Sequence, residues 1–451
     1  MKRIAQTAYG KVKGLQGNDA RITVYKGIPF AAPPVGERRF RPPQPCEKWE
    51  GILKAFEFGP ISVQDTPGLG DDLYCREWHV DPDIPMDEDC LYLNIWTPAK
   101  EPDEKLPVLV WYFGGGYQWG YTAEMEFDGE RLAARNIIVV SINYRLGVFG
   151  FLSHPEITRE NPDAPGNFGL LDQQAGLKWV YENIAAFGGD PEKITIAGQS
   201  AGGNSVMNQL AFEGNAHMIR SAVIYSGIIR FPENEKARDL FDPPVLSEAE
   251  KRGEDFFSYI GVKSLEEARS ISALEIRDKY ERYREDHPFF ANIRDGRFCK
   301  KDPYETFIEG GGAKVPVISG NTVDEFVTDG VNTVEISVKE VFDGRIKNDS
   351  SAKLFYYRFS CDIPGDDAPG CFHSCDLWFF FETLMKCRRP FEGRHFDLAR
   401  TMCDYIANFV KTGDPNGTDA FGNSIPVWRP YSLEEKNGID FTGGGPRPFP
   451  V

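Results

Sequence analysis

The 451-residue sequence lacks the features that mark membrane-spanning, secreted and nucleic-acid-binding proteins. No stretch approaches the roughly 20 consecutive apolar residues of a membrane-spanning helix, and the first residues, MKRIAQTAYG, contain no apolar run of signal-peptide length. Basic charge is not in excess, since 51 Lys and Arg face 68 Asp and Glu and the net charge is −17. Nucleic acids and anionic membranes are bound mainly through clustered Lys and Arg, so we expect neither as a partner. We expect a cytoplasmic protein, whose oligomeric state the sequence does not indicate.

Cysteine and histidine are sparse as well. Nine Cys is an odd number in a chain of this length and does not indicate the disulfide framework of a small secreted domain. Cys371, His373 and Cys375 have a spacing that suggests a metal, but no second Cys or His pair follows at the distance found in zinc fingers. We therefore expect no metal ligands and no cofactor.

Short apolar runs bounded by turn residues predict buried strands. Three of them, at 91–97, 106–113 and 136–142, are almost continuously apolar, which is typical of strands covered on both faces. Farther along the chain, helical spacing over 170–187 is followed by strand-like KITIAGQ, a helical segment and strand-like SAVIYSG. This alternation predicts an α/β fold with a central, mostly parallel twisted sheet and helices on both faces.

Two regions depart from this alternation. The first thirty residues read as antiparallel strands joined at Gly17, Asn18 and Asp19. Residues 231–312 are charged and helical without strong strand signals, so we interpret them as a helical insertion that caps the sheet. Since no repeat or linker interrupts the chain, we expect a single domain over residues 1–451.

The most informative motif is G-x-S-x-G at residues 198–202, with Ser200 at its centre. The pentapeptide alone is a weak signal, but here a strand-like run precedes it and a helical run follows it. A sharp strand-to-helix turn exposes the serine hydroxyl, and the start of the helix favours negative charge. Ser200 is therefore a candidate nucleophile, in preference to an ordinary serine at a glycine-rich helix start.

A nucleophilic serine needs a base, which in α/β-hydrolases follows the nucleophile in the chain. His373 is the best candidate, because it lies in a loop between a strand and an aromatic helical run. His217, His287 and His395 lie in segments where packing or solvent contact is the simpler interpretation.

An acid must orient that imidazole, and the strand VPVISG is followed by NTVDEF. A carboxylate at the carboxyl end of a sheet strand lies where such sites are assembled. Asp324 and Glu325 are adjacent, and their spacing does not choose between them.

Three consecutive glycines, Gly114, Gly115 and Gly116, follow the apolar strand at 106–113. Without a Cβ, their backbone N–H groups can approach a substrate oxygen closely. Together with the N–H of Ala201 they are candidates for an oxyanion hole.

At this point the sequence resembles the type B carboxylesterase family, which includes the cholinesterases. FGGDPEKITIAGQSAGG resembles the nucleophile signature of that family and EDCLYLNIWTP its second signature. YKGIPFAAPPVGERRF, VWYFGGGYQWG and VVSINYRLGVFGFL also resemble family segments, so the likeness extends over most of the chain.

The resemblance implies roles for individual residues. It makes Ser200 the nucleophile, His373 the base and Glu325, rather than Asp324, the acid. It makes the N–H groups of Gly115, Gly116 and Ala201 the oxyanion donors. Ser226, at the end of SAVIYSG, matches a serine that supports the triad by hydrogen bonding.

The sequence also departs from the family. Phe113 stands where many relatives have His or Tyr, Phe326 stands where Gly is common, and Gln199 replaces the Glu that helps cholinesterases handle a cationic substrate. Glu325 and His373 are only 48 positions apart, so either a helical segment over the pocket is absent or the sequence omits residues there.

Cys90 matches a disulfide cysteine of secreted relatives, and Cys75 is its candidate partner. Without a signal peptide, we expect both as free thiols.

The resemblance implies a serine ester hydrolase acting on small to medium apolar or aromatic esters. The alternatives are a catalytically silent recognition protein of the same fold, or a hydrolase of thioesters, amides or carbamates. Several aromatic residues are candidates for the pocket lining, although aromatic residues are more often core: Trp78, Trp119, Phe289, Phe290 and Trp378.

Overall fold

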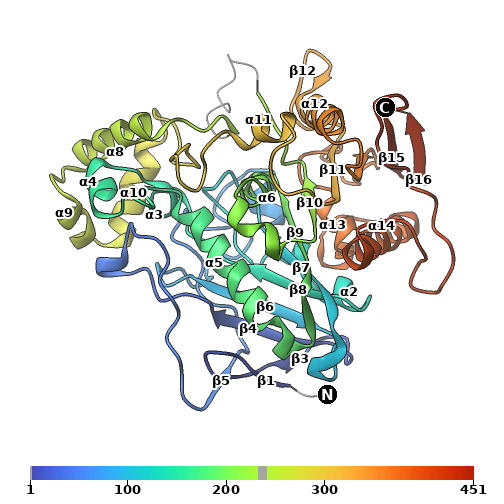
Figure 1. Ribbon diagram of the computed structural model, residues 1–451, viewed down its shortest axis with the longest axis horizontal. Coiled ribbons are helices and arrows are strands. Elements are labelled where there is room, and N and C mark those ends of the chain that lie inside the picture. Colours follow the sequence, from blue (N-terminus) through green and yellow to red (C-terminus); the bar gives the residue numbers. More distant parts are fainter. Residues whose placement is uncertain (1–2, 232–240, 451) are drawn as a thin grey trace.

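The computed structural model describes residues 3–231 and 241–450. Within these residues the centre is a mixed eleven-stranded sheet (Figure 1). In spatial order the strands are β16 (Gly445–Pro450), β15 (Asn437–Thr442), β14 (Leu354–Phe359), β11 (Val317–Thr322), β10 (Ser221–Tyr225), β9 (Gly189–Gln199), β7 (Leu106–Tyr112), β8 (Ile138–Ile142), β6 (Tyr92–Thr97), β4 (Thr23–Pro29) and β3 (Leu15–Gln16). From β15 to β8 every neighbouring pair is parallel, and the pairs toward both edges are antiparallel. The predicted mostly parallel sheet is confirmed.

Two smaller sheets lie apart from the central one. β1 (Ile4–Gln6), β2 (Lys11–Lys13) and β5 (Ile52–Lys54) form one of them, and β12 (Val327–Thr328) pairs with β13 (Val331–Asn332) in the other. The turn expected at Gly17–Asp19 joins the antiparallel strands β3 and β4, as predicted.

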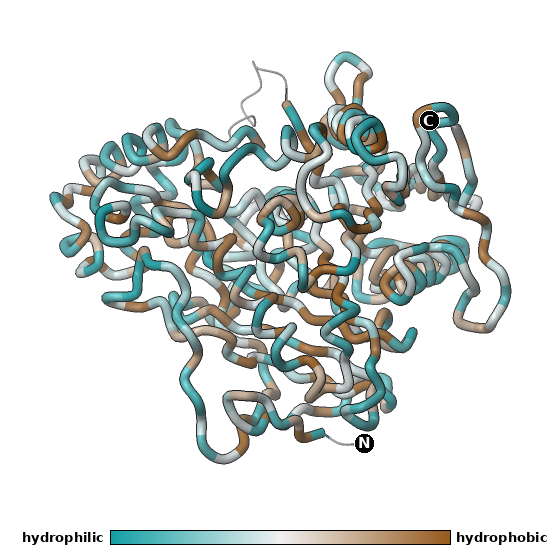
Figure 2. Tube along the Cα trace, in the orientation of Figure 1, coloured by the Kyte–Doolittle hydropathy of each residue, from teal (hydrophilic) through white to brown (hydrophobic). Residues whose placement is uncertain are grey.

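The core lies on both faces of the central sheet, and β7 shows why. Successive side chains of a strand point to opposite faces. Leu109, Trp111 and the following Phe113 belong to one buried apolar cluster, whereas Val108 and Val110 belong to a second. In Figure 2 the apolar stretches accordingly gather in the middle of the molecule. The near-continuous apolar run of this strand thus follows from its burial on both faces.

Helices cover the two faces. α5, α6 and α12 contribute apolar residues to one cluster, and α13 and α14 to the other. The helices outside the insertion are α1 (Leu73–Glu77), α2 (Glu130–Ala133), α3 (Gly147–Phe151), α4 (Pro155–Glu160), α5 (Phe168–Asn183), α6 (Ala201–Ala211), α12 (Thr333–Asn348), α13 (Leu377–Phe380) and α14 (Gly393–Thr412). Short 3₁₀ turns lie at Gly36–Arg38, Pro102–Glu104, Met125–Phe127, Ile184–Phe187, Glu213–Met218 and Leu384–Lys386. Among the described residues, no helix is long and apolar enough to cross a membrane.

The expected helical insertion is seen from residue 241 onward, since 232–240 lie outside the described residues. It contains α8 (Leu246–Ile260), α9 (Leu265–Ser270), α10 (Ala273–Tyr283) and α11 (Pro303–Ile308), and α8 to α10 lie at one end of the molecule (Figure 1). Phe256, Ile276 and Tyr280 of these helices belong to the same apolar cluster as Trp111 of β7. The single-domain interpretation stays a prediction, which this continuous packing supports.

Candidate active site

The candidate residues gather at one edge of the sheet. β7, β9, β10, β11 and β14 run parallel, so their carboxyl ends meet at this edge. Ser200 directly follows β9, Ser226 follows β10 and Glu325 follows β11 at a short distance. The glycine turn follows β7, and the loop with His373 follows β14. Ligand sites of open α/β sheets are assembled at such an edge.

Ser200 lies in a strained turn between β9 and α6. Its φ is 54° and its ψ is −124°, a combination that non-glycine residues rarely adopt. The backbone is held there because Ser200 N donates to Tyr225 O (2.9 Å) and Asn204 N donates to Ser200 O (2.8 Å). The side chain is thereby presented at the start of α6, where unpaired N–H groups favour negative charge.

The two glycines of the motif are required by close backbone packing. A Cβ on Gly198 would lie 2.2 Å from Gly202 O, and a Cβ on Gly202 would lie 2.1 Å from Tyr112 O. Since the nearby atoms belong to the backbone, they have no side-chain freedom with which to give way. The motif is therefore explained by the packing of this turn against β7.

His373 is oriented by Glu325, whose side chain is fully buried. His373 Nδ1 and Glu325 Oε2 form a short hydrogen bond, and Glu325 Oε1 accepts from Ser226 Oγ (2.8 Å) and Thr322 N (2.8 Å). A carboxylate that accepts these bonds leaves Nδ1 as the proton donor. In the neutral ring, Nε2 then carries the lone pair that a general base uses.

The neighbouring carboxylate has a different task. Asp324 Oδ2 accepts the N–H of Cys371 (2.7 Å), and Asp324 N donates to Cys371 O (3.3 Å). These bonds fasten the loop that carries His373 to the end of β11. Of the two acidic residues that spacing could not separate, Glu325 contacts the imidazole and Asp324 holds its loop.

Gln199 occupies the other side of the imidazole. Its Nε2 lies 3.0 Å from His373 Nε2, so the amide donates to the lone pair of the neutral ring. No hydrogen bond joins Ser200 to His373 within the described residues, although both side chains line the same cavity. Hydrogen bonds between catalytic groups are often loose without substrate, so this geometry is compatible with proton transfer.

The glycine turn lies beside Ser200, since a Cβ on Gly114 would lie 3.2 Å from Ser200 Cβ. The N–H groups of Gly115, Gly116 and Ala201 have no acceptor among residues 3–231 and 241–450. Gly114, Gly115 and Gly116 line the cavity together with Ser200 and His373. An unpaired N–H beside a cavity is available to a substrate oxygen.

The cavity has a volume of about 420 Å³ and a largely apolar wall that includes several aromatic rings. Of the candidate lining residues, Trp78 and Trp119 line it, whereas Phe289, Phe290 and Trp378 are not part of its described wall. Trp378 lies in the core at 1% exposure, as its alternative interpretation expected. The other apolar lining residues are Tyr74, Phe127, Phe231, Phe241, Phe326 and Leu377.

Comparison with known proteins identifies the family. A model of the carboxylesterase family matches residues 1–358 and 333–444. The chain belongs to the carboxylesterase family. The two matched segments overlap at 333–358, inside the short interval between Glu325 and His373.

Relatives in this family include esterases from animals and bacteria. Mouse (Mus musculus) cholinesterase is 30% identical over 516 residues, covering 96% of this chain and 82% of the relative. The para-nitrobenzyl esterase of Bacillus subtilis is 37% identical over 333 residues, covering 72% of this chain and 63% of the relative. The fumonisin B1 esterase of Sphingopyxis macrogoltabida is 34% identical over 326 residues, covering 72% and 56%. The chain thus matches about six-tenths of the length of either bacterial relative.

Solved structures of carboxylesterases have the same fold. A Geobacillus stearothermophilus carboxylesterase superposes with a TM-score of 0.83 at 29% identity, covering 100% of this chain and 98% of that one. A PNB esterase superposes with a TM-score of 0.82 at 27% identity, covering 100% and 97%. The fold is therefore the α/β-hydrolase fold, as predicted.

A polar cluster in the cavity wall was missed by the sequence analysis. His79 Nδ1 lies 3.1 Å from Glu124 Oε1, and both line the cavity beside Glu126. Burial opposes the charge of His79, but Glu124 outweighs it and raises the pKa of His79. Burial and the neighbouring Glu124 raise the pKa of Glu126 well above its usual value. All three residues precede Ser200, whereas the search for a base considered only the residues after it.

Another buried carboxyl group lies near the imidazole and Glu325. Asp376 is fully buried, and its Oδ2 accepts from Tyr357 Oη (2.8 Å). Burial, reinforced by the negative charge of Glu325, raises the pKa of Asp376 to about 7. Asp376 therefore titrates near neutral pH, close to the catalytic candidates.

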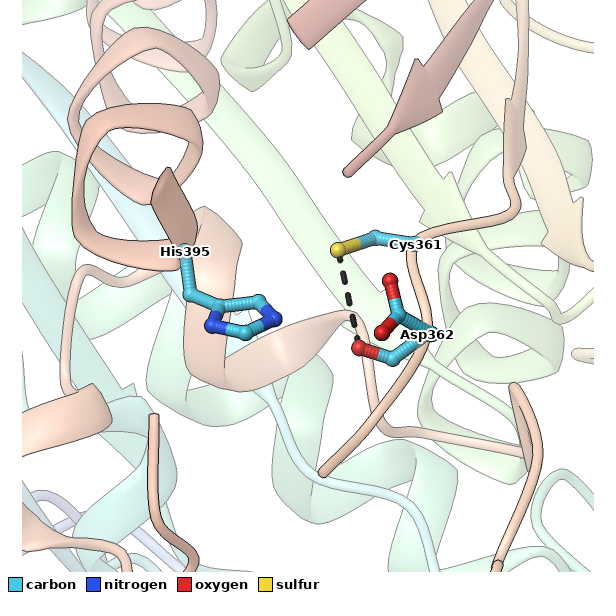
Figure 3. Close-up of side chains that lie close together, drawn as sticks. All are labelled: Cys361, Asp362 and His395. Carbon is cyan, nitrogen blue, oxygen red and sulfur yellow. Dashed lines mark hydrogen bonds between the residues drawn. The ribbon is translucent and has the colours of Figure 1, made fainter. Parts of the chain in front are cut away.

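One group of side chains has the separation of metal ligands, and Figure 3 shows it. The ligand atoms of Cys361, Asp362 and His395 lie within 4.8 Å of one another. However, His395 Nδ1 accepts the N–H of Glu392 (2.9 Å), which puts the ring proton on the Nε2 that faces the other two residues. Asp362 is engaged by Arg394 (2.9 Å). These bonds do not suit a metal, because a ligating nitrogen needs its lone pair.

The cysteines discussed above are thiols. Cys75 and Cys90 are free, as expected, and so are the remaining seven. Cys371 Sγ donates to Cys361 O (3.0 Å), and burial raises the pKa of Cys371 to about 12. A thiol that holds its proton so firmly is a poor metal ligand.

Proposed function

We propose that this protein is a serine carboxylesterase in which Ser200 is the nucleophile, His373 the base and Glu325 the acid. The observation that carries the proposal is the convergence of a strained strand-to-helix serine and a carboxylate-bound imidazole on one cavity. Membership of the carboxylesterase family supports the same activity.

The reaction begins when Ser200 attacks the ester carbonyl and His373 Nε2 takes its proton. Glu325 stabilises the imidazolium that forms, and Ser226 and Thr322 keep its carboxylate in place. The N–H groups of Gly115, Gly116 and Ala201 bind the oxyanion of the tetrahedral intermediate. His373 then protonates the leaving alcohol. A water molecule next attacks the acyl-enzyme while His373 takes its proton, and return of that proton to Ser200 releases the acid.

Gln199 has to release the imidazole during this cycle. Its amide donates to Nε2 in the free protein, and the Ser200 hydroxyl needs that same lone pair. The exchange replaces one hydrogen bond with another at the same atom, so its free-energy cost is small.

The cavity favours small to medium apolar or aromatic esters. Its volume of about 420 Å³ suits a small ligand, and aromatic rings form much of its wall. Phe326 narrows it beside the base, with its ring centroid 4.7 Å from that of His373. Gln199 is neutral where cholinesterases carry Glu, which argues against choline esters.

The experiment is hydrolysis of 4-nitrophenyl butyrate by wild type and Ser200→Ala. We expect kcat to fall by about 10⁵-fold or more, because no other group supplies the attacking oxygen. Ser374→Ala is the control, since Ser374 lines the same cavity and should be dispensable as a nucleophile.

A fluorophosphonate probe should label wild type and Ser374→Ala but not Ser200→Ala. Wild type that neither reacts with the probe nor hydrolyses the ester would show a catalytically silent member of the fold. Faster turnover of matched thioesters, amides or carbamates would change the bond but keep the triad.

A further inference from the structure

The turn with the three glycines is hydrogen-bonded to Gln118 and Trp119, which follow it in the sequence. Gln118 N and Trp119 N both donate to Gly115 O, at 2.9 and 3.0 Å. Gly115 has a φ of 102°, and a Cβ placed on it would lie 2.1 Å from Trp119 O. The Gly115 peptide therefore cannot shift without moving the backbone of Gln118 and Trp119.

The side chain of Gln118 joins this turn to the helical insertion. Its Nε2 donates to Phe290 O (2.8 Å) and to Gly116 O (3.2 Å), and its Oε1 accepts from Tyr280 Oη (2.7 Å). Phe290 N in turn donates to Tyr280 Oη (2.9 Å). One buried amide thus links a cavity-lining glycine to α10 and to the segment that follows it.

All three members of this network are shielded from water. Gln118 and Tyr280 are each 3% exposed and Phe290 is 5% exposed. A buried amide whose donor and acceptor are both satisfied holds its position, because any movement leaves polar atoms unpaired. The network can therefore transmit the position of α10 to the glycine turn.

Trp119 provides a second attachment on the same side. Its Nε1 donates to Asp65 Oδ2 (3.2 Å), and the Arg284 guanidinium lies 4.6 Å from the centre of its ring. Arg284 also forms ion pairs with Asp65 and Glu281. These contacts are more exposed than those of Gln118, so we expect them to contribute less to holding the glycine turn in place.

We propose that Gln118 and Tyr280 are positioning residues for the oxyanion hole, through which the helical insertion holds the Gly115 and Gly116 N–H groups in place. The inference rests on the proposed function, in which these N–H groups bind the oxyanion. Such donors must be placed to within a few tenths of an ångström of their best distance from the developing charge. Loosening the turn therefore weakens the binding of the transition state more than the binding of the substrate.

The test compares Gln118→Met and Tyr280→Phe with Tyr283→Phe as the matched control. Gln118→Met keeps a side chain of similar size without its amide, and Tyr280→Phe removes one hydroxyl. Tyr283 lies on the same helix and its ring stacks on His287 and Phe290, but its hydroxyl takes no part in the hydrogen bonds of Gln118, Tyr280 and Phe290. We expect kcat for 4-nitrophenyl butyrate to fall about 10- to 100-fold in the first two variants, with KM changed less than about threefold. The control should match wild type.

A trifluoromethyl ketone separates positioning from general stability. It adds to the nucleophilic serine and forms an oxyanion, so its affinity should fall by the same factor as kcat/KM. The corresponding methyl ketone, as a ground-state analogue, should bind equally well to all forms. The double variant should lose little more than either single variant, because both changes break one network.

Three outcomes distinguish the possibilities. If Tm falls in the variants but kcat and ketone affinity do not, Gln118 and Tyr280 are structural only and the positioning proposal is wrong. If Gln118→Met does not fold, Tyr280→Phe decides alone, because it loses a single hydroxyl. If wild type neither hydrolyses esters nor reacts with a fluorophosphonate, the proposed function is wrong, and the positioning role with it.

Discussion

The two sides of the cavity are fastened in different ways. On the acid–base side, Glu325 is held by Ser226 and by Thr322 at the end of β11, and Asp324 holds the loop of His373, so these anchors lie at the carboxyl edge of the sheet. On the oxyanion side, the glycine turn is anchored through Gln118 to Tyr280 and thus to the insertion.

The central sheet positions the acid and the base, whereas the insertion helps to position the oxyanion donors. The ends of parallel strands bring the acid and the base together in any chain with this sheet. The insertion lies outside the central sheet, and under our proposal its contacts position the oxyanion donors. We expect changes on the first side to abolish proton transfer and changes on the second to weaken transition-state binding.

Among the variants that test this comparison, Glu325→Gln should lower kcat the most. The amide would face His373 Nδ1 with an N–H group, which favours the tautomer whose proton lies on Nε2. That nitrogen could then no longer accept the Ser200 proton, so kcat should fall about 10³- to 10⁴-fold. The measurement is kcat for 4-nitrophenyl butyrate.

Asp324→Asn is the matched control for Glu325→Gln. Its amide oxygen can still accept the Cys371 N–H, so activity should stay within about tenfold of wild type. The reverse order of effects would show that Asp324, rather than Glu325, supports the base.

Gly115→Ala should have the second largest effect, on the oxyanion side. The added Cβ meets Trp119 O at 2.1 Å and the residue keeps a φ of 102°, so the turn must move. Losing one oxyanion donor typically lowers kcat by about 10²- to 10³-fold, and we expect this range with KM little changed.

Gly36→Ala separates this clash from the strain of a positive φ. Gly36 has a φ of 57°, and beyond its two chain neighbours no described atom lies within 4 Å of the position that a Cβ would take. The variant should lose about 1 kcal/mol of stability and no activity. A similar loss of kcat in both variants would contradict a specific role for Gly115.

Much of this arrangement could be predicted from local sequence. The buried strands were visible as apolar runs, and G-x-S-x-G combined with its flanking periodicity predicted Ser200 at a strand-to-helix turn. These features depend on neighbouring residues, so a short window contains the information. The choice of Glu325 over Asp324 was beyond such a window and came from the family resemblance.

Other features depend on packing between distant segments. Gln118 and Tyr280 are 162 positions apart, and nothing in either segment indicates their hydrogen bond. α12 was also missed, because TVEISVKEVFDGRIKN is rich in β-branched residues, which have a low helix propensity. Its Val334, Val338 and Val341 are nevertheless buried against the sheet, so tertiary contacts outweigh the weak propensity.

Asp376→Asn should lower kcat less than Glu325→Gln or Gly115→Ala does, and it tests the electrostatics of the acid–base side. With its pKa raised to about 7, Asp376 stays protonated in the folded protein at pH values where the unfolded chain is ionised. Between about pH 4 and 7 the folded state binds the extra proton, so this group lowers stability as pH rises, by about 1.4 kcal/mol per pH unit at most. Asn carries no such penalty and can still accept a hydrogen bond from Tyr357.

Thermal unfolding at pH 5 and pH 8 should therefore show the variant gaining Tm relative to wild type at the higher pH, with kcat reduced less than about tenfold. Parallel Tm changes in the two proteins would mean that Asp376 ionises normally and that the acid–base side tolerates a second negative charge beside Glu325.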